Sequence, residues 1–310
     1  MISSVSAVLS GLPYTMLPLI FSPAELAAIK PTDCFVWSQA TAPTPLSVSY
    51  KQYVDVGAGF EEVEDGSFTS SIVLKEAVTP YQKTWQFEID GDASGLDIAE
   101  SLLIDDEIVK IIRVDYKTNT LTVGRGCADT LPQVHAKGAR AWCYLLGAGV
   151  NQTAYLPNEA VKARLLTVTP QQTQDAASAA VIQLTTRQRQ ARPYPPGNVK
   201  FDGILSNTIT DGTGFKLTWA HRDRDIQADQ LIAHTEDSTV LGAGVSYKVD
   251  LLDGDRLVRS ITTTDTTFTY PDTGKVEGEQ FNKITLYSVK DKLTSLYPYE
   301  FAVAAPKTGG

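Results

Sequence analysis

Alternation of apolar and polar residues is the dominant pattern of this chain, and it predicts strands far more often than helices. From Ser47 onward, β-branched and aromatic residues occupy every second position of three segments, SVSYKQYVDV, SFTSSIVL and TWQFEID, with glycine and acidic residues between them. This spacing is typical of half-buried strands bounded by turns. We therefore expect a mainly β protein.

The middle of the chain continues this pattern. SLLIDDEIVKIIRVDYKTNTLTVGRG predicts three short strands in a meander, with turns at the acidic pair Asp105 and Asp106 and at Asn119. ARAWCYLL and VKARLLTVTP predict further strands. The polar, alanine-rich segment QQTQDAASAAVIQLTTRQRQ predicts either a short helix or an extended linker between modules.

The first 50 residues mix apolar runs with prolines, which favours irregular structure or short edge strands over helices. One short helix is expected at SPAELAAI, where Ser22 can cap, Pro23 takes the first position and Glu25 completes a capping box. The apolar stretch at 7–29 is interrupted by prolines and follows no positive charge, so we expect neither a signal peptide nor a membrane span. It should be buried or packed in an interface.

A proline cluster, ARPYPPGNV, precedes the last part of the chain. Pro193, Pro195 and Pro196 fix their own φ near about −65° and extend the residues before them, which predicts a stiff domain junction. The roughly 110 residues after it contain short strands at intervals of about 8 to 12 residues, the spacing of a β-sandwich. The residues expected on its core face are Phe215, Leu217 and Trp219 in one strand and Tyr247, Val249 and Leu251 in a hairpin that turns at Asp253 and Gly254.

These patterns predict four regions. We expect a β-rich or irregular anchoring region at 1–90, a small β domain at 91–170, a linker at 171–196 that ends in the proline junction, and a β-sandwich at 197–310. A chain of 310 residues is long enough for such a multidomain arrangement.

Two resemblances sharpen this interpretation. The order of the strands around Trp219, Tyr247, TTFTY and Tyr287 resembles a fibronectin type III module. ARPYPPGNVKFDG, LTWAHRDRDIQADQL and LYSVKDKLTSLYPYEFAV together resemble the C-terminal part of tail-tip or baseplate proteins of tailed bacteriophages, and LIDDEIVKI with LTVGRGCADTLPQVHAKGARAW is similar to an upstream segment of the same family. The resemblance covers roughly residues 95 to 305.

The family pattern in the upstream segment falls on Arg125, Gly126, Thr130, His135 and Gly138. The resemblance implies a virion structural protein of the tail tip or baseplate, assembled in the host cytoplasm with other phage tail proteins. It also implies a symmetric homo-oligomer, with a trimer favoured. Symmetric assemblies of this kind depend on large self-complementary or ring-forming interfaces.

Composition limits the other functions. The net charge of −9 and a pI near 4.9 argue against nucleic acid as a partner, because phosphate binding depends on clustered Lys and Arg. Cys34, Cys127 and Cys143 form neither a zinc pattern nor a disulfide framework, so they are interpreted as apolar fillers or free thiols.

No catalytic, cofactor or metal site is predicted. The three histidines, His135, His221 and His234, have no recognisable nucleophile motif beside them, so we expect no enzyme. DGDASGLDIAES matches the first positions of a calcium loop but has Ser101 at the twelfth position, which favours an acidic turn. The carboxylate pairs Glu61–Glu62 and Asp105–Asp106 are poor glycosidase candidates, because adjacent strand residues face opposite sides.

Two groups of residues are candidates for partner contacts. Arg222 and Arg224 belong to a mixed-charge RDRD run that is either a solvated surface loop or a contact between subunits. Tyr297 and Tyr299 are either core or interface residues of the last strand, or part of a face that binds a host-surface glycan. Glycan binding by the terminal sandwich is therefore the alternative function.

Overall fold

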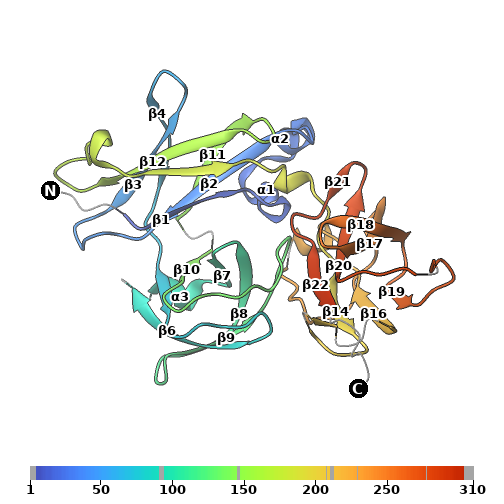
Figure 1. Ribbon diagram of the computed structural model, residues 1–310. Helices are drawn as coiled ribbons and strands as arrows, with labels where there is room; N and C mark the ends of the chain where they lie inside the picture. The colour runs from blue at the N-terminus through green and yellow to red at the C-terminus, as the bar shows by residue number, and fades with distance from the viewer. Residues whose placement is uncertain are drawn as a thin grey trace. The chain divides into compact units, whose positions relative to one another are not determined.

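The computed structural model describes residues 5–90, 94–144, 147–206, 208–209, 213–228, 230–276 and 278–303 (Figure 1). The chain is mainly β and multidomain, as the alternation predicts. It divides into two compact units, of which the first comprises Met1–Gly124 and Gln133–Ala191. The second comprises Arg125–Pro132 and Arg192–Gly310, so a short segment from the middle of the chain belongs to it.

Two sheets of the first unit pack face to face as a sandwich. The smaller sheet has the order β1 (Ala7–Gly11), β2 (Cys34–Ala40), β11 (Gly149–Tyr155), and the larger has the order β13 (Val181–Thr185), β12 (Ala160–Val168), β3 (Ser49–Asp55), β4 (Phe60–Gly66). Val36 of β2 packs with Val54 of β3 and with Val161 and Ala163 of β12 in one core cluster. The sandwich is therefore closed by apolar residues from both sheets.

A central strand lies within the region expected to be irregular. β2 carries the run CFVWSQA, all of it buried, between β1 and β11. This run lacks the alternation of a half-buried strand, and burial of every residue, Ser38 and Gln39 included, is typical of a strand covered on both faces. The nearby prolines concealed this in the sequence, because they fall in the segments that flank the strand.

A closed six-stranded barrel forms the rest of the first unit. Its order is β10 (Arg140–Cys143), β5 (Ser71–Leu74), β6 (Thr84–Asp90), β9 (Thr120–Gly124), β8 (Glu107–Asp115), β7 (Ser101–Ile104). The alternating strands point Ile72, Leu74, Trp85, Phe87, Leu102, Val109, Leu121 and Val123 into one core. The predicted meander is confirmed, with Asp105 and Asn119 at positive φ in its two turns.

The boundary predicted at residue 90 falls inside this barrel. β5 and β6 precede residue 90, yet they pair with β10 and β9, which follow it. Non-local pairing of this kind leaves no mark in local composition. Short helix α3 (Ser94–Ile98) follows β6 in the connection to β7.

The N-terminal segment contains the predicted helix. α2 (Pro23–Ala28) begins after Ser22, whose Oγ accepts the Glu25 N–H at 3.4 Å while the Glu25 Oε2 accepts the Ser22 N–H at 2.7 Å, so the capping box is confirmed. A 3-10 turn η1 (Tyr14–Met16) and α1 (Leu17–Ile20) precede it. Within the described ranges, no helix is both long and apolar enough to span a bilayer.

The second unit is a fibronectin-III-like β-sandwich. One sheet has the order β14 (Gly197–Phe201), β16 (Phe215–Ala220), β19 (Thr267–Tyr270), and the other has the order β15 (Thr208–Ile209), β22 (Tyr299–Val303), β20 (Lys283–Lys290), β17 (Val245–Asp253), β18 (Arg256–Thr263), with β21 (Leu293–Thr294) paired to β20. The six core residues predicted on β16 and β17 are all buried. The hairpin turn at Asp253 and Gly254 is also confirmed.

The region predicted as a linker, 171–196, is largely structured. It contains the 3-10 turn η2 (Ala176–Ser178), strand β13 and the 3-10 turn η3 (Arg189–Ala191), and β13 extends the larger sheet of the sandwich in the first unit. Pro193, Pro195 and Pro196 are buried, and the second unit begins at Arg192. The prolines therefore belong to a packed segment and not to an exposed spacer.

Candidate functional site

The connection between β9 and β10 contains the five residues of the family pattern. Arg125, Gly126 and Thr130 lie in the part that belongs to the second unit, whereas His135 and Gly138 lie in the first. The side chains of Arg125, Thr130 and His135 are buried. The structure therefore divides the pattern into two clusters, one in each unit.

The second-unit part, Arg125–Pro132, is called the inserted segment below. Leu131 packs into the core of the sandwich, and the main-chain N–H of His234 donates to the Arg125 carbonyl at 2.7 Å. Both the N–H and the Oγ1 hydroxyl of Thr130 donate to the Cys127 carbonyl, at 3.1 and 2.7 Å, which closes a tight turn. Apolar packing and main-chain bonds thus fix the segment at several points.

Gly126 is required by the shape of that turn. Its φ is +56°, and a Cβ atom at this position would lie 2.5 Å from Cδ of Pro132 and 2.8 Å from its nitrogen. Gly138 also has a positive φ, +85°, but a Cβ there would meet nothing within 4 Å. The first glycine is needed for both conformation and space, and the second for conformation alone.

His135 lies in the first unit between two carboxylates. Its Nδ1 is 2.6 Å from Oδ2 of Asp105 and its Nε2 is 2.8 Å from Oε2 of Glu107. His135 and Glu107 are fully buried, whereas the Asp105 side chain is 57% exposed. Local sequence patterns could not reveal this pair of partners, because both come from the β7–β8 hairpin about 30 residues earlier.

Arg222 is buried and not available as a surface contact. Its two terminal nitrogens donate to five main-chain carbonyls, those of His221, Ala233, His234, Glu236 and Asp237, at 2.9 to 3.2 Å. Burial lowers the pKa of this guanidinium below its usual range. The side chain organises the connection between β16 and β17, so for Arg222 both alternatives for the RDRD run, a solvated surface loop and a contact between subunits, are wrong. Arg224, in contrast, is half-buried.

Tyr299 is likewise an internal residue. Its ring is 6% exposed and stacks on Phe301, with ring centroids 5.9 Å apart, and its hydroxyl lies 2.7 Å from Nδ1 of His234. Tyr297 is partly buried against the same core. The structural alternative for Tyr299 is therefore confirmed, and its ring cannot form part of an exposed glycan-binding face.

His221 also serves the fold. Its Nδ1 lies 2.8 Å from the Tyr247 hydroxyl, and the two rings stack. Burial lowers the pKa of His221 and raises that of Tyr247. Both groups are therefore held in their neutral forms near pH 7.

The cysteines behave as small apolar residues. Cys34, Cys127 and Cys143 are buried free thiols, as the sequence predicts, and burial raises the pKa of Cys143 to about 12. Across the described residues, no cluster of His, Cys, Asp or Glu side chains could hold a metal ion. In the calcium-like stretch, Asp90 pairs with Arg140, and Asp92 lies outside the described residues.

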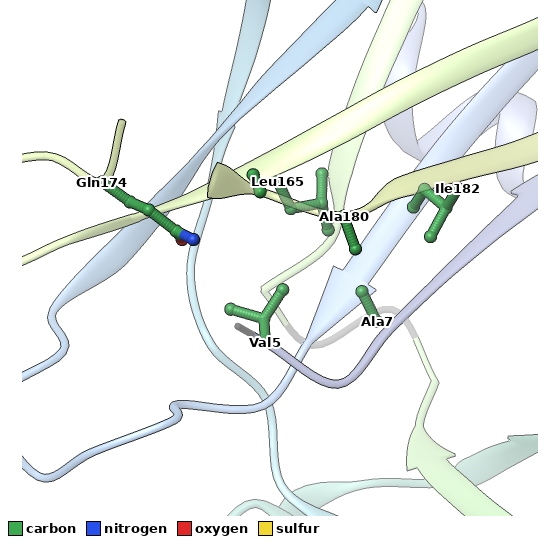
Figure 2. A pocket seen from close by; sticks show the side chains of 7 residues that line it. Val5, Ala7, Leu165, Gln174, Ala180 and Ile182 are labelled. Atoms are coloured by element: carbon green, nitrogen blue, oxygen red, sulfur yellow. The ribbon is translucent and has the colours of Figure 1, made fainter. Parts of the chain in front are cut away.

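A small cavity of about 110 Å³ opens beside the first strand of the chain. Figure 2 shows its lining side chains, which come from β1 and the segment leading into it, from β12, and from β13 and the segment leading into it. Val5, Ala7, Leu165 and Ile182 line it with apolar surface, and the Gln174 side chain contributes an amide. Alternation could not predict this cavity, because its walls are far apart in the sequence.

Comparisons with known proteins give no family for this chain. No protein-family model matches it, and no curated protein matches it. Among solved structures, it aligns with the FN1–FN3 domains of chicken CNTN1 at 11% identity and a TM-score of 0.21, over 76% of this chain and 65% of the other. A central fibronectin-III array of RIM-binding protein aligns at 11% identity and a TM-score of 0.25, over 88% and 93% of the two chains.

A third solved structure, the BSP domain of a biofilm-associated protein, aligns at 10% identity and a TM-score of 0.19. The alignment covers 78% of this chain and 30% of the other. The chain thus spans less than two thirds of the CNTN1 and biofilm-protein chains.

Proposed function

We propose that this chain is a structural component of a bacteriophage tail tip or baseplate that acts by protein–protein assembly. The proposal rests on the structural role of the five residues of the family pattern. Arg125, Thr130 and His135 are buried, and Gly126 and Gly138 supply positive-φ turns, so these residues stabilise the internal structure of the unit in which each lies. Residues that stabilise internal structure in this way suit a component that must keep its conformation within a large assembly.

The rest of the proposal follows from the same resemblance. The chain is assembled in the host cytoplasm, joins other tail proteins as a symmetric homo-oligomer, with a trimer favoured, and remains in the mature virion. The two compact β-rich units each offer surface to neighbouring proteins. Its net charge of −9 favours protein partners over nucleic acid.

The decisive experiment places the chain in the particle. Purified virions are examined by mass spectrometry for this chain and by cryo-electron microscopy of the tail end, with particles from a deletion strain as the matched control. We expect symmetric density at the tail tip that accommodates both β units and that disappears in the deletion strain. Absence of the chain from purified particles would overturn the proposal.

Glycan binding by the terminal sandwich remains the second hypothesis. Since the Tyr299 ring is buried, this activity would need other surface residues. Binding of the full chain to immobilised host envelope, with the same chain after heat denaturation as control, tests it independently of virion assembly.

A further inference from the structure

The number of protons that the cluster of His135, Asp105 and Glu107 must hold follows from its hydrogen bonds. Both ring nitrogens of His135 lie within hydrogen-bond distance of a carboxylate oxygen, at 2.6 Å to Asp105 and 2.8 Å to Glu107. The same Oε2 atom of Glu107 also accepts the Gln133 N–H at 2.9 Å. Each of the two ring contacts needs one proton between its nitrogen and its oxygen.

A neutral imidazole cannot supply both protons. It carries one N–H donor and one bare nitrogen acceptor, whereas ionised carboxylates only accept. The cluster must therefore hold one proton more than a neutral ring with two carboxylates. Imidazole is more basic than a carboxylate, so the ring is where the proton is held, and it then faces a carboxylate oxygen at each of its two nitrogens.

We propose that His135 is an imidazolium and that it acts as a proton-dependent latch at the point where the inserted segment returns to the barrel. Beside the ring, the main-chain N–H of Val78 donates to the His135 carbonyl at 2.9 Å, and the His135 N–H donates to the Val78 carbonyl at 3.1 Å. The N–H of Gln133, the first residue after the inserted segment, donates to Glu107. When the extra proton is lost, one of the two hydrogen bonds between the His135 ring and the carboxylates breaks. The segment from Gln133 to His135 is then held less tightly to Val78 and Glu107.

The surroundings of the ring set the direction of the switch. Asp105 and Glu107, both on the β7–β8 hairpin, place a carboxylate oxygen at each ring nitrogen, and Trp85 of β6 presents an aromatic edge with ring centroids 6.1 Å apart. An unfolded histidine loses its proton near pH 6.5. Above that pH the closed latch holds one proton more than the open chain, so its opening equilibrium rises by up to about tenfold per pH unit.

The substitution Asp105→Asn separates this mechanism from a purely structural role. The introduced amide can donate to a bare Nδ1 while Nε2–H donates to Glu107, so both ring contacts survive with a neutral imidazole. We therefore expect this variant to keep the latch closed but to lose its pH dependence. Asp106→Asn, at the adjacent exposed position, is the matched control and should behave as the wild type.

The test uses the full chain and two measurements. Nitrogen NMR of ¹⁵N-histidine-labelled protein at pH 7.5 should show both His135 nitrogens protonated in the wild type and in Asp106→Asn, and one protonated nitrogen in Asp105→Asn. Hydrogen exchange of the Val78, Gln133 and His135 amides is measured from pH 7 to 9 and corrected for intrinsic exchange. The opening equilibrium constants should rise with pH in the wild type and in Asp106→Asn but not in Asp105→Asn. A neutral His135 in the wild type, or the same pH dependence in all three proteins, would overturn the proposal.

This inference does not depend on the proposed role in a phage tail. Virion localisation and the protonation state of His135 are measured separately, so either can fail alone.

Discussion

Gly126 offers the sharpest test of the inserted segment. In Gly126→Ala, the alanine must adopt φ near +56°, which costs about 1–2 kcal/mol for a residue with a Cβ atom. The new Cβ also lies 2.5 Å from Cδ of Pro132, a ring atom that cannot rotate away. Overpacking of this kind costs about 1–3 kcal/mol, so we expect a total loss of about 2–5 kcal/mol in the free energy of unfolding of the second unit.

Gly254→Ala is the matched control for this substitution. Gly254 lies in the same unit at φ +61°, but a Cβ there would meet nothing within 4 Å. It should therefore show the conformational cost alone, about 1–2 kcal/mol. The difference between the two variants isolates the contact with Pro132.

The assay must report on the second unit separately. Trp219 is its one tryptophan, since Trp37, Trp85 and Trp142 lie in the first unit. Urea unfolding of protein labelled with 5-fluorotryptophan, followed by ¹⁹F NMR of the Trp219 signal, gives the stability of this unit. Equal losses in Gly126→Ala and Gly254→Ala, within about 0.5 kcal/mol, would refute the packing of Gly126 against Pro132.

Further predictions concern single side chains. Leu131→Ala should destabilise the second unit by about 2–5 kcal/mol in the same ¹⁹F assay, because it leaves a cavity in the sandwich core; a loss below about 1 kcal/mol would contradict that placement. Arg222→Met should cost at least about 3 kcal/mol there, because five main-chain carbonyls each lose a charge-assisted hydrogen bond from the guanidinium, and an unchanged urea midpoint would contradict these bonds. Burial lowers the pKa of His221, so the unfolded chain binds more protons below about pH 6.5 and the second unit loses stability as the pH falls. His221→Asn should flatten this decline between pH 7 and 5, and an unaltered slope would count against it. Ser22→Ala should raise amide exchange in α2 about fivefold, for a cap worth about 1 kcal/mol, whereas exchange equal to the wild type would show that the capping box is not formed in solution.

Local patterns in the sequence were sufficient for many strands and turns. The alternation in TWQFEID places Trp85 and Phe87 inside the barrel, and the alternation in FKLTW places Leu217 inside the sandwich. The capping box at Ser22 was equally predictable, because its two residues are three positions apart. In each case the side chains that determine the structure are close neighbours in the sequence.

Features that depend on distant residues could not be predicted. The barrel joins β5 to β10 across some 70 residues, and β13 reaches the sandwich of the first unit from a region that resembles a linker in composition. Arg222 lies in a charged run typical of a surface loop, yet four of its five carbonyl partners are 11 to 15 residues later. The carboxylate partners of His135 were concealed for the same reason.

The inserted segment also sets an order of events during synthesis. Leu131, a core residue of the second unit, leaves the ribosome with the segment that ends at Pro132, whereas the rest of that unit begins 60 residues later, at Arg192. At elongation rates of about 5–20 residues per second, the segment waits at least about 3–12 s for its first partner strand. The nascent chain carries Leu131 without the rest of its core while the first unit is completed, so the second unit becomes resistant to proteases after the first.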